Sequence, residues 1–302
     1  MTMPYTPTRD FVGYGAVPPH PQWPGGARLA VNFCINYEEG GEPSVPDGDE
    51  RSETGLVEGG SLNLPGRDLA AESMFEFGSR VGFWRLHRLF EERGLPATVY
   101  ACSLALERNP AVCEAIRDGN YDVCAHGMRW EHHQGMSEEQ ERERIRQAVL
   151  GIERATGRRP DGWYCRYGPS VNTRRLVVEH GGFLYDSDAY NDELPYWLRV
   201  GGKAHLVVPH NLVNNDTKYI RGAMVTGSDF FEYMKETFDV MYREGRDRPK
   251  MMTVSLHLRV IGHAGRSSGL ARFLDHIRGF PDVWICQRRE IAQHWHRTFP
   301  AG

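Results

Sequence analysis

Short apolar runs alternate with amphipathic segments along most of this chain. The apolar runs predict strands at 29–36, 97–101, 121–125, 162–165, 183–186, 206–209, 252–257 and 283–286. Apolar residues at helical spacing predict helices at 79–93, 110–117, 137–157, 173–180, 229–244, 270–279 and 289–298. Strands that alternate regularly with such helices are typical of parallel β/α units. Seven or eight units predict an α/β fold with seven or eight parallel strands, in a closed or nearly closed (β/α) barrel that forms one domain over 1–302.

Local signals predict where several helices begin. Asn109 followed by Pro110 is typical of an N-cap with proline in the first turn. Ser137 and Gln140 have the spacing of a capping box, and Ser228 is expected to cap the helix at 229–244.

Residues 43–72 lack periodicity and are rich in Gly, Pro, Ser and acidic residues, which predicts a long loop. Loops of this length usually carry function or make partner contacts, so we expect it to cover a pocket or to join subunits. Disorder is the alternative.

The composition and charge of the chain argue against nucleic acid and membranes as binding partners. The 302 residues carry a net charge of −4, which gives no basic surface for nucleic acid or for an anionic membrane. The N-terminal residues lack the pattern of a secretory signal, and no apolar stretch approaches the length of a membrane span. The six cysteines show no paired or metal-finger spacing. We therefore expect a cytoplasmic protein with reduced cysteines and with neither a nucleic-acid nor a membrane partner.

Polar residues follow the predicted strands, where catalytic groups gather in β/α barrels. Glu38, Glu39 and Glu42 come directly after the first strand, among glycines. Adjacent carboxylates repel and contribute little to a core, so this cluster favours a functional site over a solvated charge run. The later strand ends carry His126, Arg166, Asp186 with Asp188, and His257.

These residues also resemble a known family. Tyr37-Glu-Glu-Gly40 is similar to the Phe-Asp-Asp-Gly motif of the polysaccharide deacetylase superfamily, His126 matches the first histidine of its His-x-x-x-His motif, and Ser255-Leu256-His257 resembles its closing Leu-x-His motif. Segments 36–42, 76–80, 126–130, 172–175, 181–188 and 194–197 resemble its bacterial allantoinase and cyclic imide hydrolase branch. The resemblance implies a distorted, TIM-like deacetylase barrel, a homo-oligomer (a tetramer in this branch), and hydrolysis of C–N bonds in small ureides, imides or amides.

Hydrolysis of an amide needs an activated water, a stabilised oxyanion and a proton for the leaving nitrogen. With the resemblance in mind, we expect Glu38 to act as general base, and Glu39 and His126 to orient it or to bind a metal. Arg166 is expected to keep Glu38 ionised and His257 to act as the acid. Adjacent carboxylates should titrate separately, which would leave one more basic than the other.

Five further residues are predicted to contact substrate: Glu42, Trp130, Tyr167, Asp186 and Asp188. Trp130 offers a flat wall for a planar ring, although burial in the core would explain it equally well. The two aspartates could bind ring N–H groups, with helix capping or turn formation as the alternative.

The resemblance is compatible with two states of the cofactor site, no metal or one divalent ion. If an ion is bound, zinc is the one we expect first. Sugar deacetylases hold their metal with an aspartate and two histidines. Here Glu39 and His126 match two positions, but Trp130 stands at the third and indole cannot ligate zinc. Glu42, His132 or water would have to complete a metal shell.

The spacing between 164–168 and 172–175 is also longer than expected for allantoinases, which leaves the identity of the substrate open. A metal-dependent polysaccharide or chitooligosaccharide deacetylase is the alternative enzyme, and a silent binding protein is the alternative without catalysis.

Overall fold

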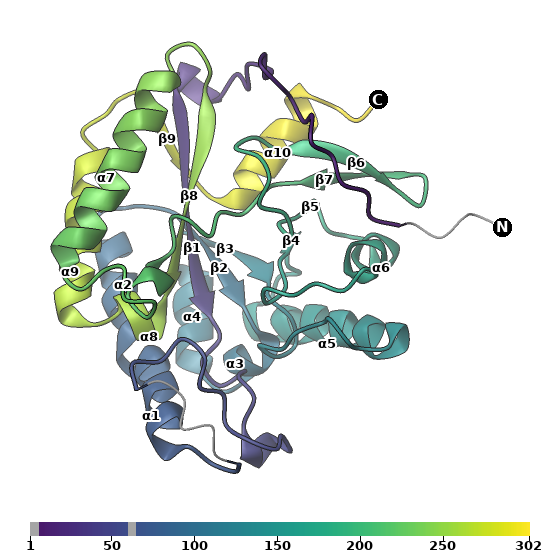
Figure 1. The fold of residues 1–302 in the computed structure, drawn as a ribbon, viewed down its shortest axis with the longest axis vertical. Helices are drawn as coiled ribbons and strands as arrows, with labels where there is room; N and C mark the ends of the chain where they lie inside the picture. The colour runs from purple at the N-terminus through teal and green to yellow at the C-terminus, as the bar shows by residue number, and fades with distance from the viewer. Residues whose placement is uncertain (1–5, 60–64) are drawn as a thin grey trace.

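A mostly parallel nine-stranded sheet runs through the protein in this computed structural model, which describes residues 6–59 and 65–302 (Figure 1). The strand order is β6-β7-β5-β4-β3-β2-β1-β8, and β9 pairs with β1. The strands are β1 Leu29–Tyr37, β2 Ala97–Ala101, β3 Tyr121–Ala125, β4 Gly162–Trp163, β5 Tyr185–Asp186, β6 Tyr196–Val200, β7 Lys203–Val207, β8 Lys250–His257 and β9 Val283–Cys286.

Strand β1 lies between β8 and two other strands, β9 and β2, and all nine of its residues are buried. It pairs over 29–36 with β8 on one side. On the other side it pairs first with β9 over 29–32 and then with β2 over 34–37. A strand covered on both faces and both edges needs apolar residues throughout, which explains the unbroken apolar run in the sequence.

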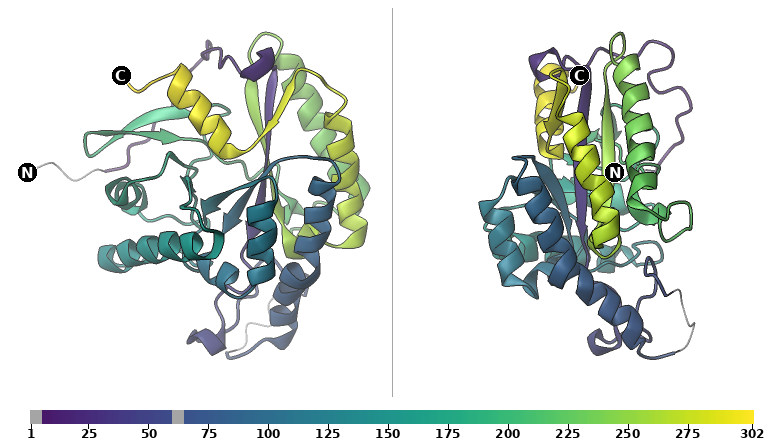
Figure 2. Two further views of the ribbon diagram at one scale, coloured as in Figure 1. Left: turned by 180° about the vertical axis from the view of Figure 1, so that it is seen from behind. Right: turned by 90° about the vertical axis from the view of Figure 1, so that its left-hand side faces the viewer.

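Helices cover both faces of the sheet (Figure 2). Helix α7 packs against α9 beside β8, and α3 packs against α5 (Figure 1). The helices are α1 Leu69–Phe77, α2 Phe83–Glu91, α3 Ser103–Glu107, α4 Pro110–Asp118, α5 Glu138–Thr156, α6 Thr173–His180, α7 Gly227–Glu244, α8 Leu258–Ile261, α9 Ala264–Ile277 and α10 Arg288–Thr298. No helix among the described residues is long and apolar enough to cross a membrane.

Two of the predicted helix caps are confirmed and one is wrong. Asn109 accepts a hydrogen bond from the backbone N–H of Val112, and Ser137 forms the capping box with Gln140. Helix α7 begins earlier than expected, because Thr226 rather than Ser228 is its N-cap and pairs reciprocally with Asp229.

The predicted helix at 79–93 also begins too late. Helix α1 continues through a π-helical turn, Gly78–Gly82, into α2, so that the helical segment starts at Leu69. Gly78 and Gly82 pack too closely against Glu39 and the backbone of Leu258 to carry a Cβ. The two glycines thus allow the helical segment to lie close to Glu39 and Leu258, and they do not interrupt it.

A closed barrel of parallel strands is not seen. Strands β6 and β7 form an antiparallel hairpin at the end of the sheet, and 196–200 was not predicted as a strand. Its turn, Gly201-Gly202, has positive φ at both residues, as the two-residue turns of hairpins require. Within the described residues no hydrogen-bonded strand pairing joins β6 to β8, the two ends of the strand order. An isolated bridge between Asn215 and Ser255 of β8 is the pairing found there.

The loop predicted at 43–72 ends earlier than expected, because residues from Leu69 onwards belong to α1. Residues 60–64 lie outside the described part of the chain. The loop contains a short 3₁₀ turn, Val45–Asp47, and lies beyond the carboxyl end of β1 (Figure 1).

Candidate active site

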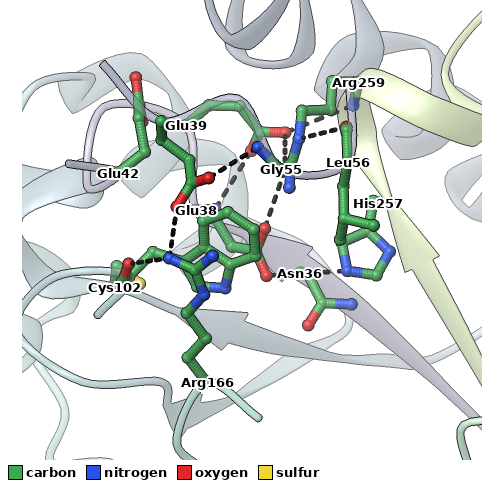
Figure 3. A network of polar contacts seen from close by, with 12 residues as sticks. Asn36, Glu38, Glu39, Glu42, Gly55, Leu56, Cys102, Arg166, His257 and Arg259 are labelled. Atoms are coloured by element: carbon green, nitrogen blue, oxygen red, sulfur yellow. Dashed lines mark hydrogen bonds and ion pairs between the residues drawn. The ribbon is translucent and has the colours of Figure 1, made fainter. Parts of the chain in front are cut away.

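Glu38 stands at the centre of a buried group of ionisable side chains at the carboxyl end of β1. Its Oε1 lies 3.3 Å from Nε2 of His126 and 3.7 Å from Nε2 of His257. Its Oε2 lies 2.8 Å from Nη1 of Arg259 (Figure 3). The side chains come from the ends of β1, β3 and β8, so the prediction that these strand ends converge is confirmed.

His126 is held in a fixed orientation by its other ring nitrogen. Nδ1 lies 2.7 Å from the carbonyl oxygen of Tyr164, to which it can only donate, and the two rings stack with centroids 5.1 Å apart. Nε2 is therefore the atom that His126 presents to Glu38 and to the cavity.

His257 is paired with a carboxylate that the sequence analysis did not single out. Its Nδ1 lies 2.7 Å from Oδ1 of Asp216, and its backbone N–H donates to Oδ2 of the same residue, also at 2.7 Å. Burial alone would lower the pKa of His257, but the negative charges of Asp216 and Glu38 outweigh it and raise that pKa. Asp216 follows Asn214 and Asn215 in a polar run after the strand predicted at 206–209, and that position was the available signal.

Arg259 is the cation that faces Glu38. It is the second residue of α8. Its Nη1 lies 3.1 Å from Oε1 of Glu39, and its Nε donates to the carbonyl oxygen of Leu56 at 3.1 Å (Figure 3). Its guanidinium carbon lies 4.4 Å from the ring centroid of Phe75 and 4.8 Å from that of Trp130. Burial would raise the pKa of Glu38, but Arg259 and the two histidines hold it well below its usual range.

Arg166 does not contact Glu38 as predicted. Its Nη1 donates to Oε2 of Glu53 at 2.6 Å and to the carbonyl oxygen of Trp130 at 3.0 Å. The guanidinium lies over the indole of Trp130, 3.7 Å from the ring centroid. Glu53 of the 43–72 loop is thus the carboxylate that pairs with Arg166. Arg259 is the arginine that keeps Glu38 ionised.

Glu39 lies behind Glu38 and away from the cavity. Its Oε2 accepts from the backbone N–H of Glu38 at 3.1 Å, while its side chain rests against Gly78. Burial and the charge of Glu38 raise the pKa of Glu39, although Arg259 acts in the opposite direction. The two carboxylates do titrate apart, but the more basic one is Glu39 rather than the proposed base.

The predicted substrate contacts divide into two groups. Trp130 and Tyr167 line the cavity, Trp130 as a buried wall and Tyr167 with 65% of its surface exposed. Glu42 is absent from that wall: its carboxylate accepts from the backbone N–H of Gly40 at 2.5 Å, and burial raises its pKa to about 7.

Asp186 and Asp188 are likewise outside the cavity wall, so their predicted contact with ring N–H groups is not supported. Arg174 and His205 bind the carboxylate of Asp186. Asp188 accepts from the backbone N–H of Cys165 at 3.0 Å, and burial together with Asp186 raises the pKa of Asp188 to about 7. Asp186 also accepts from the backbone N–H of Asp188 at 2.9 Å, as in a turn, so both carboxylates are engaged within the protein.

A cavity of about 460 Å³ opens above Glu38. This volume lies within the range of small-molecule sites in proteins. Gly55 and Leu56 of the 43–72 loop form part of its wall, as expected of a loop that covers a pocket. The other lining residues are Asn36, Glu38, His126, Trp130, His132, Tyr164, Arg166, Tyr167, His210, Leu212, Asn215, Thr217, Arg221, Ser255 and His257.

The donor set does not fit the metal that the family resemblance allows. Glu39, one of the two predicted ligands, is turned away from the cavity and engaged by Arg259. The indole of Trp130 has no lone pair to offer a metal. A permanent cation, Arg259, already lies against Glu38 and Glu39. In the described part of the chain no group of three or more His, Cys, Asp or Glu side chains is arranged to hold an ion.

Comparison with known proteins places this site in a family. The polysaccharide deacetylase family model matches residues 67–185. A protein of Schizosaccharomyces pombe named "putative polysaccharide deacetylase" is 39% identical over 97% of this chain and 98% of its own length. A Pseudomonas aeruginosa structure titled "probable polysaccharide deacetylase" is 46% identical, with a TM-score of 0.92 over 97% of this chain and 99% of that one. The structure of PuuE allantoinase is 45% identical, with the same TM-score and coverage. The chain belongs to the polysaccharide deacetylase family.

Proposed function

We propose that this protein hydrolyses a C–N bond in a small cyclic or linear ureide, imide or amide. The observation that carries the proposal is the buried Glu38, set between His126, His257 and Arg259 at the base of a cavity of about 460 Å³. The 45% identity to PuuE allantoinase over nearly the whole chain supports this class of substrate.

Glu38 and His126 act together on the attacking water. Oε1 of Glu38 and Nε2 of His126 are 3.3 Å apart, so a proton taken from water is shared within one coupled pair. The low pKa of Glu38 keeps it anionic and able to accept a hydrogen bond from water, but makes it a weak base alone. His126, anchored at Nδ1, supplies the basicity at Nε2.

His257 supplies the proton for the leaving nitrogen. Asp216 orients its ring and stabilises the imidazolium, so the acid form persists to higher pH than for a free histidine. The carbonyl oxygen that gains negative charge lies in a cavity lined by further donors, among them Asn215 and Ser255.

Turnover on a defined panel tests the proposal against its alternative. Allantoin, succinimide and related ureides and amides are compared with chitooligosaccharides, and ring opening or acetate release is measured. We expect turnover of at least one small ring or amide and none of the polymers. Acetate release from chitooligosaccharides at rates above those for every small compound would favour a polysaccharide deacetylase instead.

The donor set predicts that activity does not depend on a divalent metal. Purified protein should contain well under one tightly bound divalent ion per chain by elemental analysis, and turnover should survive dialysis against a chelator. One zinc per chain, lost together with activity on chelation and restored together with it, would contradict the prediction.

The pair of Asp216 and His257 predicts a shift in pH dependence. Because the carboxylate raises the pKa of His257, Asp216→Asn should lower that pKa. The acid form is then lost at lower pH, so the alkaline limb of kcat/KM moves to lower pH while the acidic limb stays in place. Asp247→Asn, at an exposed position, is the matched control. Identical alkaline limbs in Asp216→Asn and wild type would remove His257 from the role of acid.

A further inference from the structure

His210 borders the same cavity and has no part in the mechanism above. It lies three residues beyond the end of β7, its side chain is 2% exposed, and its backbone N–H donates to the carbonyl oxygen of Ala189 at 2.7 Å. No carboxylate in the described part of the chain pairs with it, in contrast to His257. A buried histidine that faces a cavity and has no charged partner among these residues is available to bind a ligand in that cavity.

The surroundings of His210 favour the neutral imidazole. Burial lowers its pKa well below the usual value, and the charges of Arg288, His126 and His257 act in the same direction. A neutral imidazole has one donor and one acceptor nitrogen. It can therefore hydrogen-bond a ligand without changing its charge during the reaction.

The hydroxyl of Tyr100 lies 3.5 Å from Nδ1 of His210. Burial raises the pKa of Tyr100 well above its usual value, so the hydroxyl keeps its proton and can donate it to Nδ1. In that arrangement the proton of the neutral ring lies on Nε2, for which no hydrogen-bond partner is found among residues 6–59 and 65–302.

The ring of His210 is also held close to the reacting group. It packs on Tyr164 with centroids 4.6 Å apart, and Tyr164 stacks in turn on His126. Tyr100 lies 5.4 Å from His210 and 5.9 Å from His126 by the same measure. Shared aromatic neighbours thus fix His210 and His126 relative to each other. Such a fixed arrangement is needed if His210 is to donate a hydrogen bond beside the pair of Glu38 and His126, which accepts a proton.

We propose that His210 contacts the substrate, with Nε2–H donating to a carbonyl oxygen of the ureide, imide or amide. This rests on the proposed function and deepens it, because the site then selects compounds that present a carbonyl acceptor beside the bond that is cleaved. A neutral donor stabilises the oxygen as negative charge develops there and does not surrender its proton.

Two substitutions separate this role from a structural one. His210→Phe keeps an aromatic ring but removes the donor, and His210→Gln places an amide N–H near the position of Nε2. With succinimide and allantoin as probes, we expect His210→Phe to lower kcat/KM by about 10²-fold, the usual effect of losing one oxyanion donor, and His210→Gln to retain most of the activity. Thermal unfolding is measured for both variants. Activity of His210→Phe within threefold of wild type would overturn the proposal.

A second measurement does not depend on turnover. In protein labelled with ¹⁵N at histidine, NMR of the wild type should show the His210 ring neutral at neutral pH, with its proton on Nε2, and that proton should shift when succinimide is added. An imidazolium, or a ring protonated at Nδ1, would contradict the assignment. If the wild type turned over none of the small compounds, the proposed function would fail, whereas the ring state and its response to succinimide would still decide the role of His210.

Discussion

Replacement of Glu38 by glutamine is expected to abolish nearly all activity while the protein stays folded. The substitution is nearly isosteric but removes the negative charge that holds water and shares a proton with His126. Loss of a general base usually lowers the rate by about 10²-fold or more. We expect kcat on the best small substrate to fall by at least this factor, with a melting temperature close to that of the wild type.

Glu42→Gln is the matched control for this experiment. Glu42 is a half-buried carboxyl four residues further along the chain and outside the cavity wall, and burial raises its pKa to about 7. Its amide variant should keep activity within about threefold. If Glu38→Gln kept a third of the wild-type kcat at unchanged stability, Glu38 would not be part of the base. Equal losses in both variants would point to a structural cause.

The sequence predicted the positions of Glu38, His126 and His257 because each directly follows an apolar strand, and strand ends converge in a parallel sheet. It could not predict how Arg166 and Arg259 share the carboxylates. That choice depends on the path of the 43–72 loop, which brings Glu53 to Arg166 and leaves Arg259 for Glu38. Residue types alone give no information on such long-range pairs.

The antiparallel hairpin was missed for a different reason. The strands predicted at 183–186 and 206–209 do pair in parallel, but β5 has only two residues and β7 also pairs with the antiparallel β6, which was not predicted. The Gly201-Gly202 turn was the local signal for that hairpin. Asp216 was missed for a related reason: it lies in an irregular segment after β7, where no periodicity marks a side chain as buried.

Removal of Arg259 is expected to destabilise the protein strongly. Its guanidinium is buried against Glu38 and Glu39, so Arg259→Met leaves two carboxylates in the interior without their cation. Breaking a buried ion pair from one side typically costs about 3–5 kcal/mol. We expect a loss of this size in the free energy of unfolding at neutral pH, measured by urea denaturation.

The pH dependence and a double variant identify the source of this loss. In the wild type the lowered pKa of Glu38 contributes stability above the unfolded pKa, and that contribution disappears as the pH falls towards the folded pKa. Without Arg259 the part of this contribution that the guanidinium supplies is lost, so the difference between wild type and Arg259→Met should be largest at neutral pH and shrink in acid. Glu39→Gln, which removes one of the two uncompensated charges, should restore about 0.5–3 kcal/mol to Arg259→Met, as expected for residues in direct contact. A cost that was independent of pH, with no recovery in the double variant, would mean that Arg259 stabilises the fold through its packing on Phe75 and Trp130 rather than through charge.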